Sequence, residues 1–176
     1  MTNDIRKRNA MTALKWALYF VMLFVCYCLQ TFPHLFAVAN GIKPSLILPL
    51  CVAVAIYEGE FGGALFGLIG GTMWDIASGR IAGLFGIILL VLCFTIGVMI
   101  KLILKANTFN CFILSFASML VLTGFDFIFG YLIFGYSGAG VYYWGYIFPI
   151  VVYTAAVSPA LYWPVTKIYK RLTWTD

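Results

Sequence analysis

Long apolar runs alternate with short polar breaks along the chain, and this pattern predicts helices that cross a lipid bilayer. A helix needs ~20 apolar residues to span ~30 Å of hydrocarbon. The runs predict six helices, at residues 13–32, 44–57, 61–78, 82–104, 109–134 and 142–166. The second run is short, because its 14 residues rise only ~21 Å as a helix. We therefore expect the second and third helices to form a tight hairpin that does not cross fully.

Small residues recur at every fourth position through the third predicted helix and its flanks. The row comprises Gly59, Gly63, Gly67, Gly71, Asp75, Gly79 and Gly83. In lipid, helices gain little by hiding apolar surface, and they associate where small residues let two backbones approach closely. Bulky residues such as Phe61 and Leu65 fall on the other half of the helix. We interpret the row as a helix-packing or partner-binding face.

Composition agrees with a membrane-embedded helical protein. Hydrophobic residues make up 64% of the 176 residues, charged residues 10%, and the mean hydropathy is +1.01. A soluble domain of this length cannot cover so much apolar surface. The expected fold is an all-α integral membrane bundle with six spans. Its domain at 13–166 lies between a cytoplasmic N-terminal segment, 1–12, and a cytoplasmic tail, 167–176.

The net charge of +5 is read as topology information, because the basic residues lie between apolar spans. This distribution argues against a nucleic-acid partner. With the N-terminus inside, nine basic residues fall on the cytoplasmic side: Arg6, Lys7, Arg8, Lys15, Lys101, Lys105, Lys167, Lys170 and Arg171. Only Lys43 and Arg80 fall outside. The positive-inside rule therefore predicts an even number of spans, with both termini in the cytoplasm.

The N-terminal region also resembles a signal peptide. Arg6, Lys7 and Arg8 precede an apolar run, and Ala37-Val38-Ala39 provides a small-x-small cleavage motif. However, the apolar run at 16–32 is longer than the usual core of a signal peptide. Cleavage would also leave five spans and spoil the charge balance. We expect the first helix to be retained.

The sequence offers little for catalysis or metal binding. The five cysteines lie in or beside apolar spans without a C-x-x-C motif, and the lone His34 lies in the first predicted outer loop. Acyl transfer needs a nucleophile beside a base. Metal-assisted chemistry needs clustered carboxylates, whereas Asp75 and Asp126 are isolated in the sequence. We expect no enzyme, no catalytic residue, no metal and no cofactor.

Glu58 and Glu60 flank Gly59 in the predicted cytoplasmic turn between the second and third helices. Polar residues are usual in turns, so the simpler interpretation is a solvated turn. The alternative is an acidic surface for a basic partner or for the chain's own Lys101 and Lys105.

Asp126 lies well inside the fifth predicted helix. A carboxylate at such depth costs at least ~2.5 kcal/mol, so it should face protein or water. It could bind across the bundle to Thr123, a tyrosine hydroxyl or Arg80, or it could line a ligand cavity or proton path. The structural role is preferred, because no second deep charge is present to form a relay.

Several motifs together suggest a family. The central part of the chain reads KPSLILPLCVAVAIYEGEFGGALFGLIGGTMWDIASGRIAGLFGIILLV, and the last span reads YIFPIVVYTAAVSPALYWPVTKIYKRL. The first has a proline-opened short span, a charged turn, the glycine row, Asp75, Ser78-Gly79 and Gly83. The second has a proline, a tyrosine, a second proline and a basic exit. In these motifs, over about residues 14–172, the chain resembles the rod shape-determining protein MreD family.

The resemblance implies a non-catalytic scaffold of the bacterial cell-elongation complex in the plasma membrane. Its implied partner is MreC and, through MreC, the actin-like MreB filaments and the enzymes that make side-wall peptidoglycan. The remaining surface is expected to contact membrane lipids.

One other class shares these features. The substrate-binding subunit of energy-coupling-factor vitamin transporters is also a six-span protein with a glycine-rich hairpin, and the MreD family is thought to share its fold. Ala13 and Ala17 also resemble the small-residue seam of those subunits. Against transport, the outer loops carry few convergent polar groups for a vitamin. A transporter subunit remains the alternative.

Overall fold

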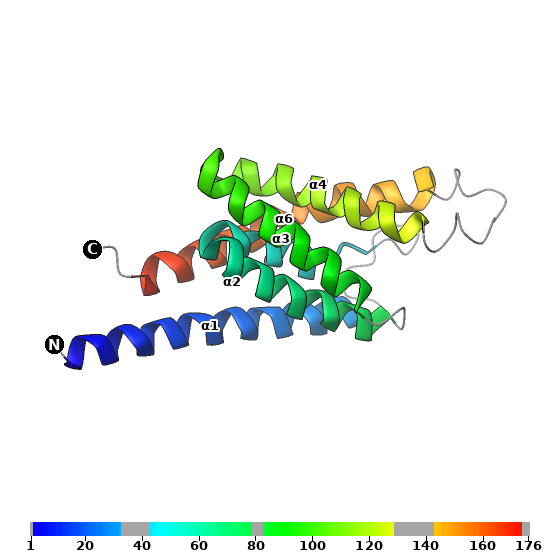
Figure 1. Ribbon diagram of the computed structural model, residues 1–176. Coiled ribbons are helices and arrows are strands. Elements are labelled where there is room, and N and C mark those ends of the chain that lie inside the picture. Colours follow the sequence, from blue (N-terminus) through cyan, green and yellow to red (C-terminus); the bar gives the residue numbers. More distant parts are fainter. Residues whose placement is uncertain (1, 33–42, 79–82, 129–142, 174–176) are drawn as a thin grey trace.

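The computed structural model describes residues 2–32, 43–78, 83–128 and 143–173, and these residues are helical apart from short connections (Figure 1). The helices are α1 (Thr2–Thr31), α2 (Ile47–Ser78), α3 (Leu84–Leu102), α4 (Thr108–Phe127), the π-helix η3 (Tyr143–Ile147) and α6 (Phe148–Leu172). Of these, α1, α2, α3, α4 and α6 are long and apolar enough to cross a membrane. The chain is therefore an all-α membrane protein.

Helix α2 is a hairpin rather than a single rod. Its backbone reverses at Gly59, where φ is 75°, a left-handed conformation that glycine adopts without steric cost. The arms, 47–58 and 60–78, run antiparallel: the Cys51 thiol lies 3.9 Å from the Phe66 carbonyl oxygen, and a Cβ atom built on Gly63 would lie 2.6 Å from the Ala55 Cα. The expected hairpin of the second and third helices is present.

The first arm of α2 is too short for a complete span of its own. It rises only ~18 Å, less than the ~30 Å of hydrocarbon. The described residues hold five helices that can cross a membrane, so the predicted six spans are not confirmed. An apolar run marks burial as readily as a membrane crossing, and this arm is buried in protein.

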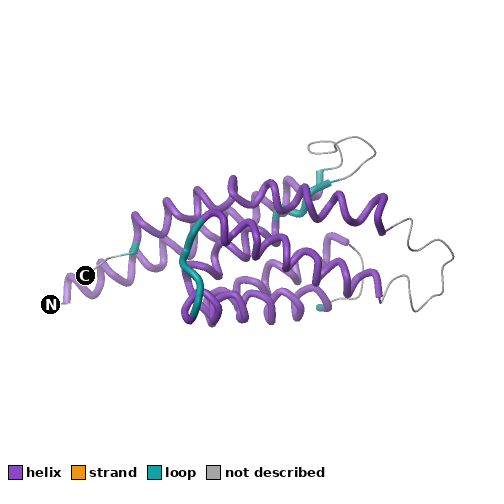
Figure 2. Tube along the Cα trace, turned by 90° about the horizontal axis from the view of Figure 1, so that it is seen from above, coloured by secondary structure: helices purple, strands orange, loops and turns teal. Residues whose placement is uncertain are grey.

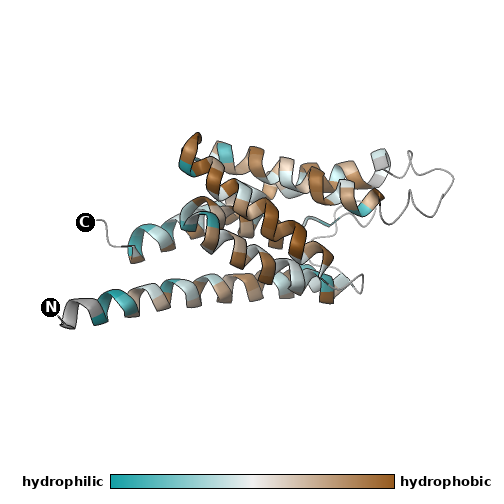
Figure 3. Cartoon of the chain, viewed as in Figure 1, coloured by the Kyte–Doolittle hydropathy of each residue, from teal (hydrophilic) through white to brown (hydrophobic). Residues whose placement is uncertain are grey.

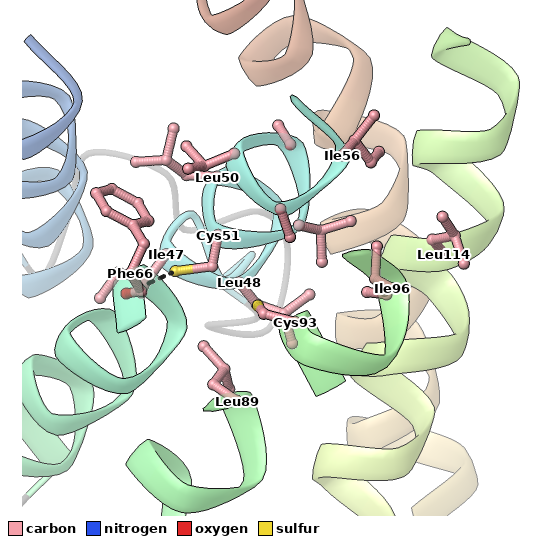
Figure 4. Close-up of a cluster of buried hydrophobic side chains, with 14 of the residues drawn as sticks. Ile47, Leu48, Leu50, Cys51, Ile56, Phe66, Leu89, Cys93, Ile96 and Leu114 are labelled. Atoms are coloured by element: carbon pink, nitrogen blue, oxygen red, sulfur yellow. Dashed lines mark hydrogen bonds between the residues drawn. The ribbon is translucent and has the colours of Figure 1, made fainter. Parts of the chain in front are cut away.

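The first arm is the centre of the core. All residues from 47 to 56 are buried, and Leu48, Leu50, Cys51 and Val54 are at most 1% exposed, so every side of this helix is enclosed. A helix that is apolar all round is stable only when it is enclosed. Figure 4 shows this arm with Phe66 of the second arm, Leu89, Cys93 and Ile96 of α3, and Leu114 of α4 around it.

The long helices run side by side along one direction (Figures 1 and 2). The first turns of α1 and the last turns of α6 lie at the same end, which we call the inner end, and both are hydrophilic (Figure 3). The opposite, outer end is where α1, α2 and α4 finish and where α3 and α6 begin.

Several helix boundaries differ from the sequence prediction. Helix α1 begins at Thr2 instead of residue 13, and α6 continues to Leu172 instead of 166. Hydropathy marks only the part of a helix that lies in lipid, whereas lysine and arginine are good helix formers and extend it into water. The segments predicted as separate N- and C-terminal parts, 1–12 and 167–176, are thus largely continuations of helices. Residues 129–134 of the fifth predicted helix lie outside the described residues.

Candidate functional site

The glycines of the second α2 arm face two neighbours. On one side, Cβ atoms built on Gly63 and Gly70 would lie 2.6 Å from Ala55 and from the Cys51 sulfur of the first arm. On the other side, a Cβ on Gly67 would lie 2.8 Å from the Leu89 carbonyl oxygen of α3. Real Cβ atoms do not approach so closely, so alanine would force the helices apart. The structure places these glycines against the chain's own helices.

Helix α3 has small residues at the matching positions. A Cβ on Gly71 would lie 2.6 Å from the Cα of Gly86, and one on Gly97 would lie 2.5 Å from the backbone nitrogen of Glu60. Gly86 and Gly97 are three helical turns apart and share one face. Gly97 was not among the predicted site residues, although its spacing from Gly86 in an apolar run was a visible signal.

Asp75 fixes the start of α3. Its side chain is buried, at 3% exposure, and its oxygens accept hydrogen bonds from the backbone N–H groups of Gly83 (2.9 Å), Phe85 (3.3 Å) and Gly86 (3.3 Å). The first N–H groups of a helix have no partner within it, and the helix dipole favours an anion there. Asp75 therefore supplies from α2 the cap that the Gly83 N-cap position cannot supply.

Gly79 and Gly83 are the last two glycines of the row. Gly83 has a φ of 93°, a left-handed conformation that suits glycine at the turn before α3. Gly79 lies outside the described residues.

Glu58 is not solvated, in contrast to the simpler expectation for the turn. Its carboxylate lies 2.9 Å from the Lys15 Nζ, and each side chain is only 10% exposed. The Tyr19 hydroxyl donates a second hydrogen bond at 3.1 Å, and the Lys15 ammonium lies 5.3 Å from the centre of the Tyr169 ring. This buried ion pair joins α1 to the α2 bend near α6. From the sequence, Lys15 was counted only as a topology charge.

Glu60 has the expected internal partner. Its carboxylate accepts a hydrogen bond from the Lys101 Nζ at 2.8 Å, with the lysine side chain 67% exposed. This pair joins the α2 bend to the end of α3, close to the contact at Gly97. The two acids at the bend are thus bound to basic residues of the same chain.

Asp126 is half-buried in α4 and lines a cavity of about 310 Å³ at the outer end. The expected partner Thr123 donates instead to the carbonyl oxygens of Met119 (2.7 Å) and Leu120 (3.3 Å) of its own helix. Arg80, the other named partner, lies outside the described residues. The remaining polar lining comprises Gln30, Lys43, Ser45 and Ser78, and the apolar lining includes Trp74, Phe85, Met119, Leu122 and Ile150.

A polar network at the outer end was missed by the sequence analysis. The Ser45 N–H donates to the Thr154 hydroxyl at 3.0 Å, and the Gln30 side-chain oxygen accepts from the N–H groups of Leu46 (3.1 Å) and Ile47 (3.4 Å). These contacts cap the first α2 arm. No pattern in the sequence joins residues so far apart, since Ser45 and Thr154 are separated by 109 positions.

A tyrosine contact joins the inner end of the hairpin to α6. The Tyr57 hydroxyl lies 2.7 Å from the Tyr162 hydroxyl and 3.0 Å from the Thr166 hydroxyl. The rings of Tyr57 and Tyr162 are stacked with their centres 5.5 Å apart. Within the ranges that the structure describes, no three His, Cys, Asp or Glu side chains gather as a metal site would need. The polar groups described above hold helices together.

Comparisons with known proteins give one result. A family model for rod shape-determining protein MreD matches residues 10–172, nearly the whole chain. Neither curated proteins nor solved structures give a significant match. The transporter alternative gains no support, whereas the matched family is a shape-determining membrane family and not a known enzyme family. The chain belongs to the rod shape-determining protein MreD family.

Proposed function

We propose that this protein is a non-catalytic scaffold of the bacterial cell-elongation complex, and that it acts by binding MreC in the plasma membrane. Through MreC it would reach the MreB filaments and the enzymes of side-wall peptidoglycan synthesis. Family membership supports a role in rod shape determination. The observation that carries the scaffold role is that Glu58, Glu60 and Asp75 are all bound within the chain.

Because the glycine row packs against helices of the same chain, the partner must bind another face of the protein. Gly63, Gly67 and Gly71 are buried against the chain itself, so they offer no free surface to a second protein. The row therefore builds the bundle, and a partner helix needs a different set of small residues.

Helix α1 offers such a set. It packs on the bundle through Lys15, Tyr19 and Leu23, which are buried. At 100° per residue the opposite side carries Ala13 and Ala17, and both are exposed. Close helix pairs in membranes form at small residues four positions apart. We propose that MreC binds this side of α1, at Ala13 and Ala17.

The proposal includes an orientation with both termini in the cytoplasm. It is supported by the nine-to-two distribution of basic residues and by the position of the first turns of α1 and the last turns of α6 at one end (Figure 1). In this orientation the two ion pairs lie near the cytoplasmic side and the cavity lies near the outer side.

Affinity purification in mild detergent tests the proposal. The tagged wild type should recover MreC, and a variant with Ala13→Leu and Ala17→Leu should lose it, because two bulky side chains hold the backbones apart. Val91→Leu, on the exposed side of α3, is the matched control and should retain MreC. Failure of the folded wild type to recover MreC from its own membranes would refute the proposal.

A further inference from the structure

The outer-end cavity has the properties of a small-molecule site. Its volume of about 310 Å³ lies at the lower end of the range for ligand pockets, which are mostly apolar with a few convergent polar groups. Trp74 of α2, Phe85 of α3 and Leu122 of α4 form much of the apolar lining. Side chains from several helix ends thus meet around one space.

Two opposite charges line the same cavity. Lys43 lies on the segment that precedes α2, and Asp126 lies on α4; both are half-buried. They come from separate elements, so a ligand between them would meet a cation on one side and an anion on the other. A carboxylate accepts several hydrogen bonds at once, so Asp126 can serve a ligand in addition to contacts within the protein.

Ser45 provides an independent observation. It is 3% exposed, lines the cavity, and has a side-chain oxygen without a hydrogen-bond partner among the described atoms. Its backbone N–H is held by Thr154, which fixes the residue in place. A buried hydroxyl that lacks a partner is unfavourable, and a hydroxyl can both donate and accept. A polar ligand atom in the cavity would satisfy it.

We infer that this cavity binds a small zwitterion with an apolar body, of the kind an α-amino acid with an aromatic or branched side chain presents. Its carboxylate lies at Lys43 and Ser45, its ammonium group at Asp126, and its apolar body against Trp74, Phe85 and Leu122. Binding requires no transport. The inference is independent of the proposed MreC contact, since Ala13 and Ala17 are not among the described residues that line the cavity.

Three compounds with one apolar body test the inference: L-phenylalanine, with both charges; 2-phenylethylamine, with the cation; and 3-phenylpropionate, with the anion. Thermal unfolding of the wild type in lipid nanodiscs should shift upward with L-phenylalanine at millimolar concentration and much less with the other two. Lys43→Gln and Asp126→Asn should each abolish the shift. Thr95→Ala, at an exposed position of α3 that does not line the cavity, is a control that should retain the shift.

A second readout reports on the cavity itself. In the conservative variant Ser45→Cys, a small methanethiosulfonate should modify the new thiol, as followed by peptide mass spectrometry. L-phenylalanine at twice its dissociation constant should slow that modification about threefold, because two-thirds of the sites are then occupied. Equal protection by all three compounds, protection by none, or a thiol that the reagent never reaches would each overturn the inference.

Discussion

At the scale of single residues, polar side chains of this bundle bind backbone groups or charges for which lipid offers no hydrogen-bond partner. Asp75 is the clearest case, because it binds three N–H groups at the start of α3 from the end of the neighbouring helix. The same buried carboxylate in a dry site without these donors would be strongly unfavourable. One side chain thus fixes the packing of α2 on α3.

Replacing that carboxylate tests its role. Asp75→Asn keeps the shape but turns an NH2 group toward N–H donors and removes the charge, so we expect a loss of roughly 2 kcal/mol in the free energy of unfolding. Titration with a denaturing detergent in mixed micelles measures it. Ser78→Ala removes only a part-buried hydrogen bond from an exposed residue to the Asp75 carbonyl oxygen and should change stability by less than ~0.5 kcal/mol. An Asn variant as stable as the wild type would contradict the capping role.

The buried Lys15–Glu58 pair leads to a different prediction. Removing one partner leaves an uncompensated buried charge, so Lys15→Met should cost about 3 kcal/mol. The double variant Lys15→Met with Glu58→Gln should recover much of that loss, since neither charge remains and Tyr19 can still donate to the amide oxygen.

A double-mutant cycle on the same unfolding measurement gives the coupling energy of this pair. The exposed pair Lys101–Glu60 is the natural comparison, and its coupling should stay below ~1 kcal/mol. Equal couplings for the two pairs would show that the Lys15–Glu58 pair is solvated after all.

The sequence identified acidic residues that join the helices, but for two of them it did not predict which residues they bind. The small-residue row draws attention to Asp75 and the charged turn draws attention to Glu58, but the partners of both are set by which helices lie side by side. Lys15 is 43 positions from Glu58, and periodicity places a residue on a face without showing what lies opposite. For the same reason the network of Ser45, Gln30 and Thr154 was missed.

At the scale of elements, the α2 hairpin and α3 form the unit around which the other helices pack. The period of four in the glycine row was visible in the sequence and predicted close packing, and the hairpin itself followed from the short second run. The sequence could not show that the row meets both the first arm and α3, because that depends on the reversal at Gly59.

Two glycine-to-alanine substitutions test this packing with the same chemical change. At Gly71 the added Cβ meets backbone atoms of Phe85 and Gly86 at 2.6 Å, so Gly71→Ala should cost roughly 1–3 kcal/mol of unfolding free energy. At Gly124 of α4 nothing lies within 4 Å, so Gly124→Ala should be neutral or should stabilise by up to ~1 kcal/mol through helix propensity. Equal effects at the two sites would mean that the glycine row is not a packing face.

At the scale of the whole molecule, one enclosed arm lies at the centre of a bundle of longer helices. Composition alone was enough to predict a helical membrane protein, and the motifs were enough to indicate the family. The number of spans is harder to predict from the sequence, because the first α2 arm is as apolar as a span but is short and buried within the protein. The outward sides of the longer helices expose large hydrophobic residues.

Crosslinking in living cells tests most directly the proposal that MreC binds the outward side of α1. A photoreactive phenylalanine analogue is introduced at Ala17 or, as the control, at Val91 on the exposed side of α3. We expect an adduct with MreC from Ala17 and none from Val91, because only the former lies on the proposed contact. An MreC adduct from Val91 alone, or no MreC adduct from Ala17, would contradict the account.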